Sequence, residues 1–168
     1  KIWFFGKEWP DFFRGFKRID GSVGTRNTIA ILTSVNCSAT AARKIADYFD
    51  DEKLVSFENI DNVTAYVHGT GCGMVSSGEG FEILQRVMWG YAKNPNVGGV
   101  LIVGLGCELN QIDWLLDAYG LKRGNYLQTL NIQEVAGLNQ TIEKGIKKVQ
   151  SMLPEVNKLK RTESAISN

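Results

Sequence analysis

The stretch Gly99-Val-Leu-Ile-Val-Gly-Leu105, followed by Gly106-Cys107-Glu108, decides the fold. It is an almost unbroken apolar run that ends in a short polar turn. Such a run is typical of a strand buried on both faces of a parallel sheet. A second run of this kind, Thr28–Val35, ends just before Cys37. The sequence therefore predicts at least two buried parallel strands, each with a cysteine just beyond its carboxyl end.

Two further strands are expected over Val63–His68 and Tyr126–Ile132. Apolar residues at helical spacing follow every strand. The expected helices are Ala39–Phe49, Phe81–Tyr91, Leu109–Tyr119 and Ile142–Leu153, the last of them stopped by Pro154. This alternation predicts an α/β fold: a Rossmann-like three-layer domain with a mainly parallel sheet of at least four strands and helices on both faces.

We expect this domain to occupy residues 28–154. Residues 1–27 are expected to form an N-terminal arm, and residues 155–168 a polar linker to an absent C-terminal region. The arm begins with an aromatic segment that would suit an interface with another part of the protein or with a second copy in a homo-oligomer. Its aromatic residues within the first ten positions are Trp3, Phe4, Phe5 and Trp9.

Bulk properties exclude several classes of protein. The chain has 168 residues, 43% of them hydrophobic, and a net charge of +1. A chain of this size buries roughly 70% of the surface that its unfolded form exposes, which is enough for one real core. The charge does not predict nucleic-acid binding. The sequence has neither an apolar run long enough to span a membrane nor a signal peptide, so we expect a cytoplasmic protein without a membrane partner.

The three cysteines, Cys37, Cys72 and Cys107, are evenly spaced: 72 minus 37 and 107 minus 72 are both 35. Each follows a predicted strand, and 35 residues is the length of one strand–turn–helix unit. Because the carboxyl ends of parallel strands lie at one edge of a sheet, where ligands bind, we expect the three thiols at one reactive edge. In a reducing cytosol they are available for metal binding or catalysis.

Two interpretations of these cysteines stay open. Buried free cysteines are common and inert, and would make this a ligand-binding or assembly domain with structural thiols. Three thiolates at equivalent strand ends instead suit an iron–sulfur cluster or a soft metal with one open position. A nucleotide site is disfavoured, because Met74 and Leu109 stand where a Gly-x-Gly-x-x-Gly fingerprint would need its third glycine.

Several other side chains fall at the predicted edge. His68, the single histidine, is a candidate proton donor or fourth ligand, or else a satisfied structural group. Glu108 and Glu134 are candidate bases or partners of the ligands, and could equally cap the helices beside them. Arg18 and Arg26, in the arm, either lie in a solvated loop or reach toward an anionic ligand.

The chain closely resembles the altronate and galactarate dehydratase family, and the related large subunit of sulfolactate sulfo-lyase has similar segments. The resemblance runs from about residue 15 to 153. Its segments are Arg18-Ile-Asp-Gly-Ser-Val-Gly-Thr-Arg-Asn27, Val35-Asn-Cys-Ser-Ala-Thr40, His68-Gly-Thr-Gly-Cys-Gly-Met74, Gly90-Tyr-Ala92, Val103-Gly-Leu-Gly-Cys-Glu108, Asn110-Gln-Ile112 and Ile132-Gln-Glu134.

The resemblance implies an iron-dependent hydro-lyase that removes water from a sugar acid to give a 2-keto-3-deoxy acid. It leaves open whether the iron is Fe²⁺ or an iron–sulfur cluster. The expected partners are a small-molecule sugar acid and the remaining domains of a longer enzyme. If the general base lies in those domains, the isolated chain should be inactive. A carbon–sulfur lyase of the sulfolactate type is an alternative.

The expected site combines the residues above with polar neighbours inside the same segments. The metal ligands are Cys37, Cys72 and Cys107, and the catalytic acid and base are drawn from His68, Glu108 and Glu134. The expected substrate-binding residues are Arg18, Arg26, Asn27, Asn36, Ser38, Asn110, Gln111 and Gln133.

Overall fold

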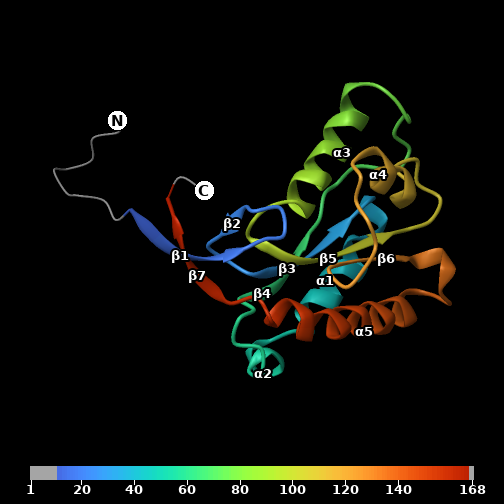
Figure 1. Ribbon diagram of the computed structural model, residues 1–168. Helices are drawn as coiled ribbons and strands as arrows, with labels where there is room; N and C mark the ends of the chain where they lie inside the picture. Colours follow the sequence, from blue (N-terminus) through green and yellow to red (C-terminus); the bar gives the residue numbers. More distant parts are fainter. Residues whose placement is uncertain (1–10, 167–168) are drawn as a thin grey trace.

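The computed structural model describes residues 11–166, arranged as two sheets and the helices that pack on them (Figure 1). The aromatic segment at positions 1–10 lies outside the described residues. The strands are β1 (Phe12–Lys17), β2 (Val23–Gly24), β3 (Thr28–Thr33), β4 (Asn62–Tyr66), β5 (Val97–Gly104), β6 (Leu127–Asn131) and β7 (Arg161–Ala165). The α-helices are α1 (Ala39–Asp47), α2 (Asp51–Leu54), α3 (Glu79–Ala92), α4 (Ile112–Ala118) and α5 (Leu138–Asn157), and the short 3-10 helices are η1 (Asn36–Ser38) and η2 (Ile132–Glu134).

The larger sheet has four parallel strands in the order β4-β3-β5-β6. On the central strand, Ile31 lies between Ala65 of β4 and Leu101 of β5. Helices cover both faces, so the predicted three-layer α/β architecture is confirmed. The strand order also locates a topological switch point: the chain leaves β3 for β4 on one side and returns to β5 on the other, so the switch point lies between β3 and β5.

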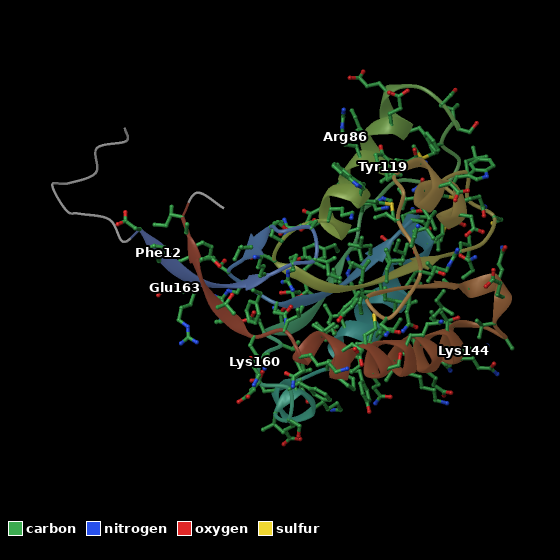
Figure 2. The ribbon with its side chains drawn as sticks, in the orientation of Figure 1. Phe12, Arg86, Tyr119, Lys144, Lys160 and Glu163 are labelled. Atoms are coloured by element: carbon green, nitrogen blue, oxygen red, sulfur yellow. The ribbon has the colours of Figure 1, made fainter. Side chains whose placement is uncertain are left out.

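Alternate residues of the buried strands supply two separate cores. Ile29 and Ile31 point to the face covered by α1 and α5, whereas Ala30 and Leu32 point to the face covered by α3 and α4. Figure 2 shows this division: Arg86 and Tyr119 lie on the α3–α4 side and Lys144 on the α5 side. Fully burying one Leu or Ile side chain stabilises a fold by about 1.5–3 kcal/mol, so these strands are firmly held.

The smaller sheet is antiparallel and has the order β2-β1-β7. β1 pairs with β7 over five residue pairs, from Phe12 opposite Ala165 to Phe16 opposite Arg161. This sheet corrects two expectations. The segment expected to be a linker, 155–168, contains the end of α5 and all of β7, and the arm expected over 1–27 contains β1 and β2. Within the described residues, the two segments are joined by the pairing of β1 with β7.

Pro154 does not end its helix as predicted, because α5 continues to Asn157. The proline is exposed, and the turn that contains it is held by contacts that follow it. Val156 is fully buried in the α1–α5 core. The Asn157 side chain accepts a hydrogen bond from the Asn59 backbone N–H (2.9 Å). These contacts outweigh the one helical hydrogen bond that a proline cannot donate.

The described part of the chain, residues 11–166, holds no helix that is both long and apolar enough to cross a membrane.

Candidate functional site

The three cysteines follow three adjacent strands of the parallel sheet. Cys37 lies in η1 just beyond β3, Cys72 in the turn after β4, and Cys107 in the turn after β5. The three turns therefore lie at one edge, on and beside the switch point. All three thiols are free and exposed. Within this domain, therefore, the cysteines are not buried packing residues.

Backbone contacts hold the first two of these turns against each other. The Asn36 N–H donates to the Thr70 carbonyl (2.8 Å), which extends the β3–β4 pairing into the turns. Gly71 has a φ of +101°, and a Cβ there would lie 3.0 Å from the Cα of Val35 and 3.1 Å from the carbonyl oxygen of Ser34. Only glycine allows both this conformation and this approach. The Cys72 turn consequently rests directly on the Cys37 turn.

The thiols affect one another electrostatically. The pKa of the Cys37 thiol is raised, first by desolvation, then by a hydrogen bond with Cys72 and by the negative charges of Cys72 and Cys107. The Cys37 Sγ also lies 3.6 Å from Oδ1 of Asn36, which accepts its hydrogen bond. Thiolates are the donors that iron–sulfur clusters and soft metal ions prefer. Within residues 11–166, however, no three His, Cys, Asp or Glu side chains are gathered closely enough to hold a metal ion.

Glu108, expected as a base, is buried, and both of its carboxylate oxygens accept hydrogen bonds from neighbouring groups of the protein. Its Oε1 accepts hydrogen bonds from the Ser34 hydroxyl and from the Leu105 N–H (3.1 Å). Its Oε2 accepts from the Gly106 N–H (2.6 Å). It does not cap α4, which begins four residues later. Ser34 directly follows β3 and Gly106 follows β5, so the carboxylate bridges the switch point.

His68 lies just beyond β4 with both ring nitrogens bonded to backbone. Its Nδ1 accepts from the Thr70 N–H (3.3 Å), and its Nε2 lies 2.9 Å from the carbonyl oxygen of Thr33. A carbonyl oxygen cannot donate, so these partners assign the proton to Nε2 in a neutral ring. The ring ties the β4 turn to the end of β3. Its role as an acid stays a prediction.

Glu134 and Gln133 lie in η2, beyond the fourth parallel strand. Both are exposed, and Glu134 Oε1 accepts a hydrogen bond from the Asn131 side chain (2.9 Å). Gln133 packs on the Cys107 turn: a Cβ on Gly106 would meet its Oε1 at 2.9 Å. The carboxylate of Glu134 thus stands at the same edge as the thiols and remains a candidate base.

The other polar residues expected at this edge divide into exposed and buried ones. Asn36 is exposed beside Cys37. Ser38 is buried, and its hydroxyl lies within hydrogen-bond distance of two carbonyl oxygens that share its one proton, those of Val35 (2.8 Å) and Val103 (2.7 Å). Asn110 is fully buried, and Gln111 donates to carbonyl oxygens of the Cys107 turn. Of these four residues, only Asn36 is exposed at this edge.

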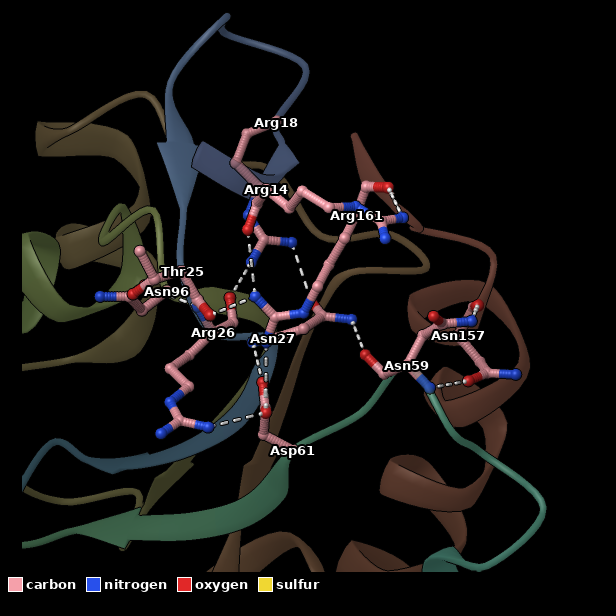
Figure 3. Close-up of polar contacts among 10 residues, drawn as sticks. All are labelled: Arg14, Arg18, Thr25, Arg26, Asn27, Asn59, Asp61, Asn96, Asn157 and Arg161. Carbon is pink, nitrogen blue, oxygen red and sulfur yellow. Dashed lines mark hydrogen bonds and ion pairs between the residues drawn. The ribbon is translucent and has the colours of Figure 1, made fainter. Parts of the chain in front are cut away.

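Arg18, Arg26 and Asn27 lie at the opposite, amino edge of the parallel sheet, which corrects their predicted place beside the cysteines (Figure 3). Asn27 directly precedes β3, and Cys37 lies four residues beyond its last residue, Thr33. Six residues at about 3.3 Å each put roughly 20 Å between the two edges. The arginine-containing motif is therefore far from the thiols of the same chain.

That motif builds a hydrogen-bonded network that joins the two sheets. Arg18 donates to the Pro95 carbonyl (2.7 Å), to Oδ1 of Asn27 (2.8 Å) and to the Arg26 carbonyl (2.9 Å). Asn27 is fully buried, and its amide donates to the carbonyl oxygens of Asn59 (2.7 Å) and Val156 (3.1 Å). The pKa of Arg18 is lowered by burial, although the charges of Asp20 and Asp61 act in the opposite direction.

Asp61 closes the network from the β4 side. It accepts from the Asn27 backbone N–H, and it forms an ion pair with Arg26 (3.2 Å) and a longer one with Arg161 of β7 (3.7 Å). The Arg161 guanidinium also stacks over the ring of Phe16, 4.4 Å from its centroid. These contacts explain why the residues are polar without invoking a ligand.

A cavity of about 570 Å³ also lies at the amino edge, under the β1–β2 turn. Apolar side chains such as Val97, Leu121 and Leu127 line most of it, and Lys93 and Lys122 also line it. No cysteine lines it. The cavity is therefore separate from the thiol edge.

Three buried polar residues near the thiol edge were not among the predicted site residues. Ser34 binds Glu108, Gln85 of α3 donates to Oδ1 of Asn110 (3.3 Å), and the Thr33 hydroxyl oxygen is buried with no partner within the described residues. The signal for Ser34 and Thr33 was a polar pair at the end of an apolar run, directly before a predicted ligand turn. Nothing local in the sequence marks Gln85.

A parallel sheet in this strand order with helices on both faces defines a Rossmann-like α/β domain, a fold in which ligands bind beyond the carboxyl ends of the strands. The family described as D-galactarate dehydratase/Altronate hydrolase, second domain, matches residues 15–157. The chain belongs to this family, so the recognised resemblance is confirmed.

The chain is also similar to individual dehydratases. It is 32% identical over 125 residues to altronate dehydratase of Bacillus subtilis, covering 73% of this chain and 24% of that protein. It is 35% identical over 97 residues to altronate dehydratase of Escherichia coli (58% and 19%). It is 36% identical over 105 residues to the L-threo-forming galactarate dehydratase of Escherichia coli (62% and 20%). The chain thus spans a quarter or less of the length of these relatives.

Proposed function

We propose that this chain is one domain of an iron-dependent hydro-lyase that dehydrates a sugar acid of the altronate or galactarate type to a 2-keto-3-deoxy acid. One observation carries the proposal. In a chain that belongs to the dehydratase family, three exposed thiols follow adjacent parallel strands around the switch point. The names of the similar proteins supply the substrate class. The remaining domains of a longer enzyme would complete the site.

Cys37, Cys72 and Cys107 would hold the iron. We favour a cluster over a single ion, because three thiolates with one open position suit an iron–sulfur cluster. Bound there, the iron would act as a Lewis acid toward an oxygen of the substrate. The Gly71 turn and the β3–β4 hydrogen bond at Asn36 would keep the first two thiols in place.

The remaining residues of the edge would bind and move protons. Glu134, exposed at the end of β6, would be the base within this chain that takes the proton alpha to the substrate carboxylate. His68 would help the beta hydroxyl leave only if its Nε2–H turns from the Thr33 carbonyl to the substrate. Asn36 would bind a substrate hydroxyl. Arg18 and Arg26 have no part in this scheme, because their contacts hold the opposite edge.

The test is to purify the protein without oxygen and to quantify iron and acid-labile sulfide in parallel. We expect both in the wild type, and a loss of both in Cys37→Ala, Cys72→Ala and Cys107→Ala. Ser76→Ala, an exposed change in the same turn as Cys72, is the matched control and should retain both. Full iron and full dehydratase activity in the three cysteine variants would refute the proposal. Iron without sulfide would replace the cluster with a single ion.

A further inference from the structure

The carboxylate of Glu108 is enclosed by the turn that carries Cys107. Glu108 is buried, with 6% of its surface exposed. Both carboxylate oxygens face donors inside the protein: the Ser34 hydroxyl and the Leu105 N–H at Oε1, and the Gly106 N–H at Oε2. A general base needs an oxygen within reach of the substrate proton. Glu108 presents neither oxygen to the edge.

The turn is shaped around this carboxylate. Gly104 ends β5, and a Cβ there would lie 2.6 Å from Oε1 of Glu108 and 2.5 Å from Oδ1 of Asn131. The missing side chain of Gly104 therefore makes the space that the carboxylate occupies. Gly106, with a φ of +117°, turns the chain so that its N–H points at Oε2. Any other residue would be strained in that conformation.

The neighbouring strand on each side of β5 fixes the same turn. From β3, Ser34 donates its hydroxyl to Glu108, and its carbonyl accepts from the Asn110 amide (3.3 Å). From the β6 side, the Gln133 N–H donates to the Leu105 carbonyl (2.9 Å). The position of Cys107 relative to Cys37 is thus set by a bridge from the end of β3 to the turn after β5.

We infer that Glu108 is a positioning residue, and that the Ser34–Glu108 bridge across the switch point sets the place of the Cys107 thiol against Cys37. Only the consequence of the bridge, the retention of iron, rests on the proposed function. The bridge itself is a property of the protein without metal. It also removes Glu108 from the candidate bases and leaves Glu134 as the carboxylate at the edge.

The first test measures amide hydrogen exchange in metal-free protein. Glu108→Gln replaces one carboxylate oxygen with an NH₂ group, which in either amide orientation faces a backbone N–H, that of Leu105 or that of Gly106, donor against donor. We expect exchange at Leu105 and Gly106 to become faster by on the order of tenfold or more. Ser34→Ala leaves the two backbone contacts intact and should give a smaller increase, about threefold. Glu143→Gln, an exposed change on α5, is the matched control and should change neither amide.

The double variant separates a bridge from two unrelated effects. If Ser34 acts through Glu108, Ser34→Ala should add almost nothing to the exchange rates of Glu108→Gln. In iron-loaded protein, both single variants should release iron to a chelator faster than wild type and in the same rank order. Ser34→Ala keeps the inference testable if Glu108→Gln fails to fold.

Two results would overturn the inference. One is wild-type exchange at Leu105 and Gly106 in folded Glu108→Gln, together with a loss of turnover and normal iron retention, as expected of a base. The other is full additivity of the two substitutions. A protein that binds no iron would instead refute the proposed function, and the exchange result in metal-free protein would still decide the role of Glu108.

Discussion

The two edges of the parallel sheet are both rich in polar residues, but they differ in how many of those polar groups are already hydrogen-bonded within the fold. At the amino edge, Arg18, Asn27 and Asp61 direct their polar atoms at one another and at backbone groups (Figure 3). At the carboxyl edge, three thiols and the Glu134 carboxylate remain exposed. Chemistry needs groups that the fold has not already used, so the carboxyl edge is the candidate site and the amino edge is a structural joint.

The largest expected effect tests the amino edge as a joint. Asn27→Ala should lower the free energy of unfolding by about 3 kcal/mol, because it removes three hydrogen bonds and leaves buried partners unsatisfied. Chemical denaturation measures this change. Iron content per folded molecule should stay at the wild-type level.

Asn139→Ala, an exposed change on α5, is the control for Asn27→Ala and should cost less than about 0.5 kcal/mol. Loss of iron from folded Asn27→Ala would show that the two edges are coupled and would break the comparison.

At the carboxyl edge, a substitution is expected to lower the free energy of unfolding less than Asn27→Ala does, but to cause a larger loss of iron. Gly71→Ala places a Cβ 3.0 Å from the Cα of Val35 at a φ of +101°. This should cost about 1–2 kcal/mol and move the Cys72 turn away from the Cys37 turn. Thermal unfolding and iron analysis measure the two effects.

Gly69→Ala is the matched control for Gly71→Ala, since a Cβ at Gly69 meets nothing within 4 Å. It should change neither stability nor iron content by a measurable amount. Equal iron retention in the two variants would mean that the packing of the two turns does not position the thiols.

The smallest effect is expected at Arg26, whose side chain is 68% exposed in its ion pair with Asp61. Arg26→Ala should lower stability by no more than about 1 kcal/mol, because exposed ion pairs contribute little. Steady-state kinetics of the complete enzyme should show an unchanged KM for the sugar acid. A KM increased tenfold or more would return Arg26 to the substrate site, with the contact made by way of another domain or copy.

The sequence predicts the parallel sheet well because that sheet is encoded locally. Each buried strand is a short apolar run, and each run is followed by residues at helical spacing, as in Thr28–Val35. The edge that carries the thiols follows from parallel topology alone. Pro154 misleads because its local effect is outweighed by the burial of Val156, a tertiary contact.

The small sheet and the true role of the polar motifs could not be predicted locally. β1 and β7 pair across residues such as Arg14 and Glu163, which are far apart in the sequence, and neither strand is a continuous apolar run. Glu108 and Arg18 have the residue types of a site. Only the positions of Ser34 and Asn27 beside them show that their polar atoms are already bonded.

The most direct test of iron binding by the three thiols is X-ray absorption spectroscopy at the iron K-edge, on protein purified without oxygen. The account predicts sulfur as the main first-shell scatterer of iron, and a large loss of bound iron in Cys72→Ala with none in Ser76→Ala. A first shell of oxygen and nitrogen alone, unchanged in the cysteine variants, would contradict it.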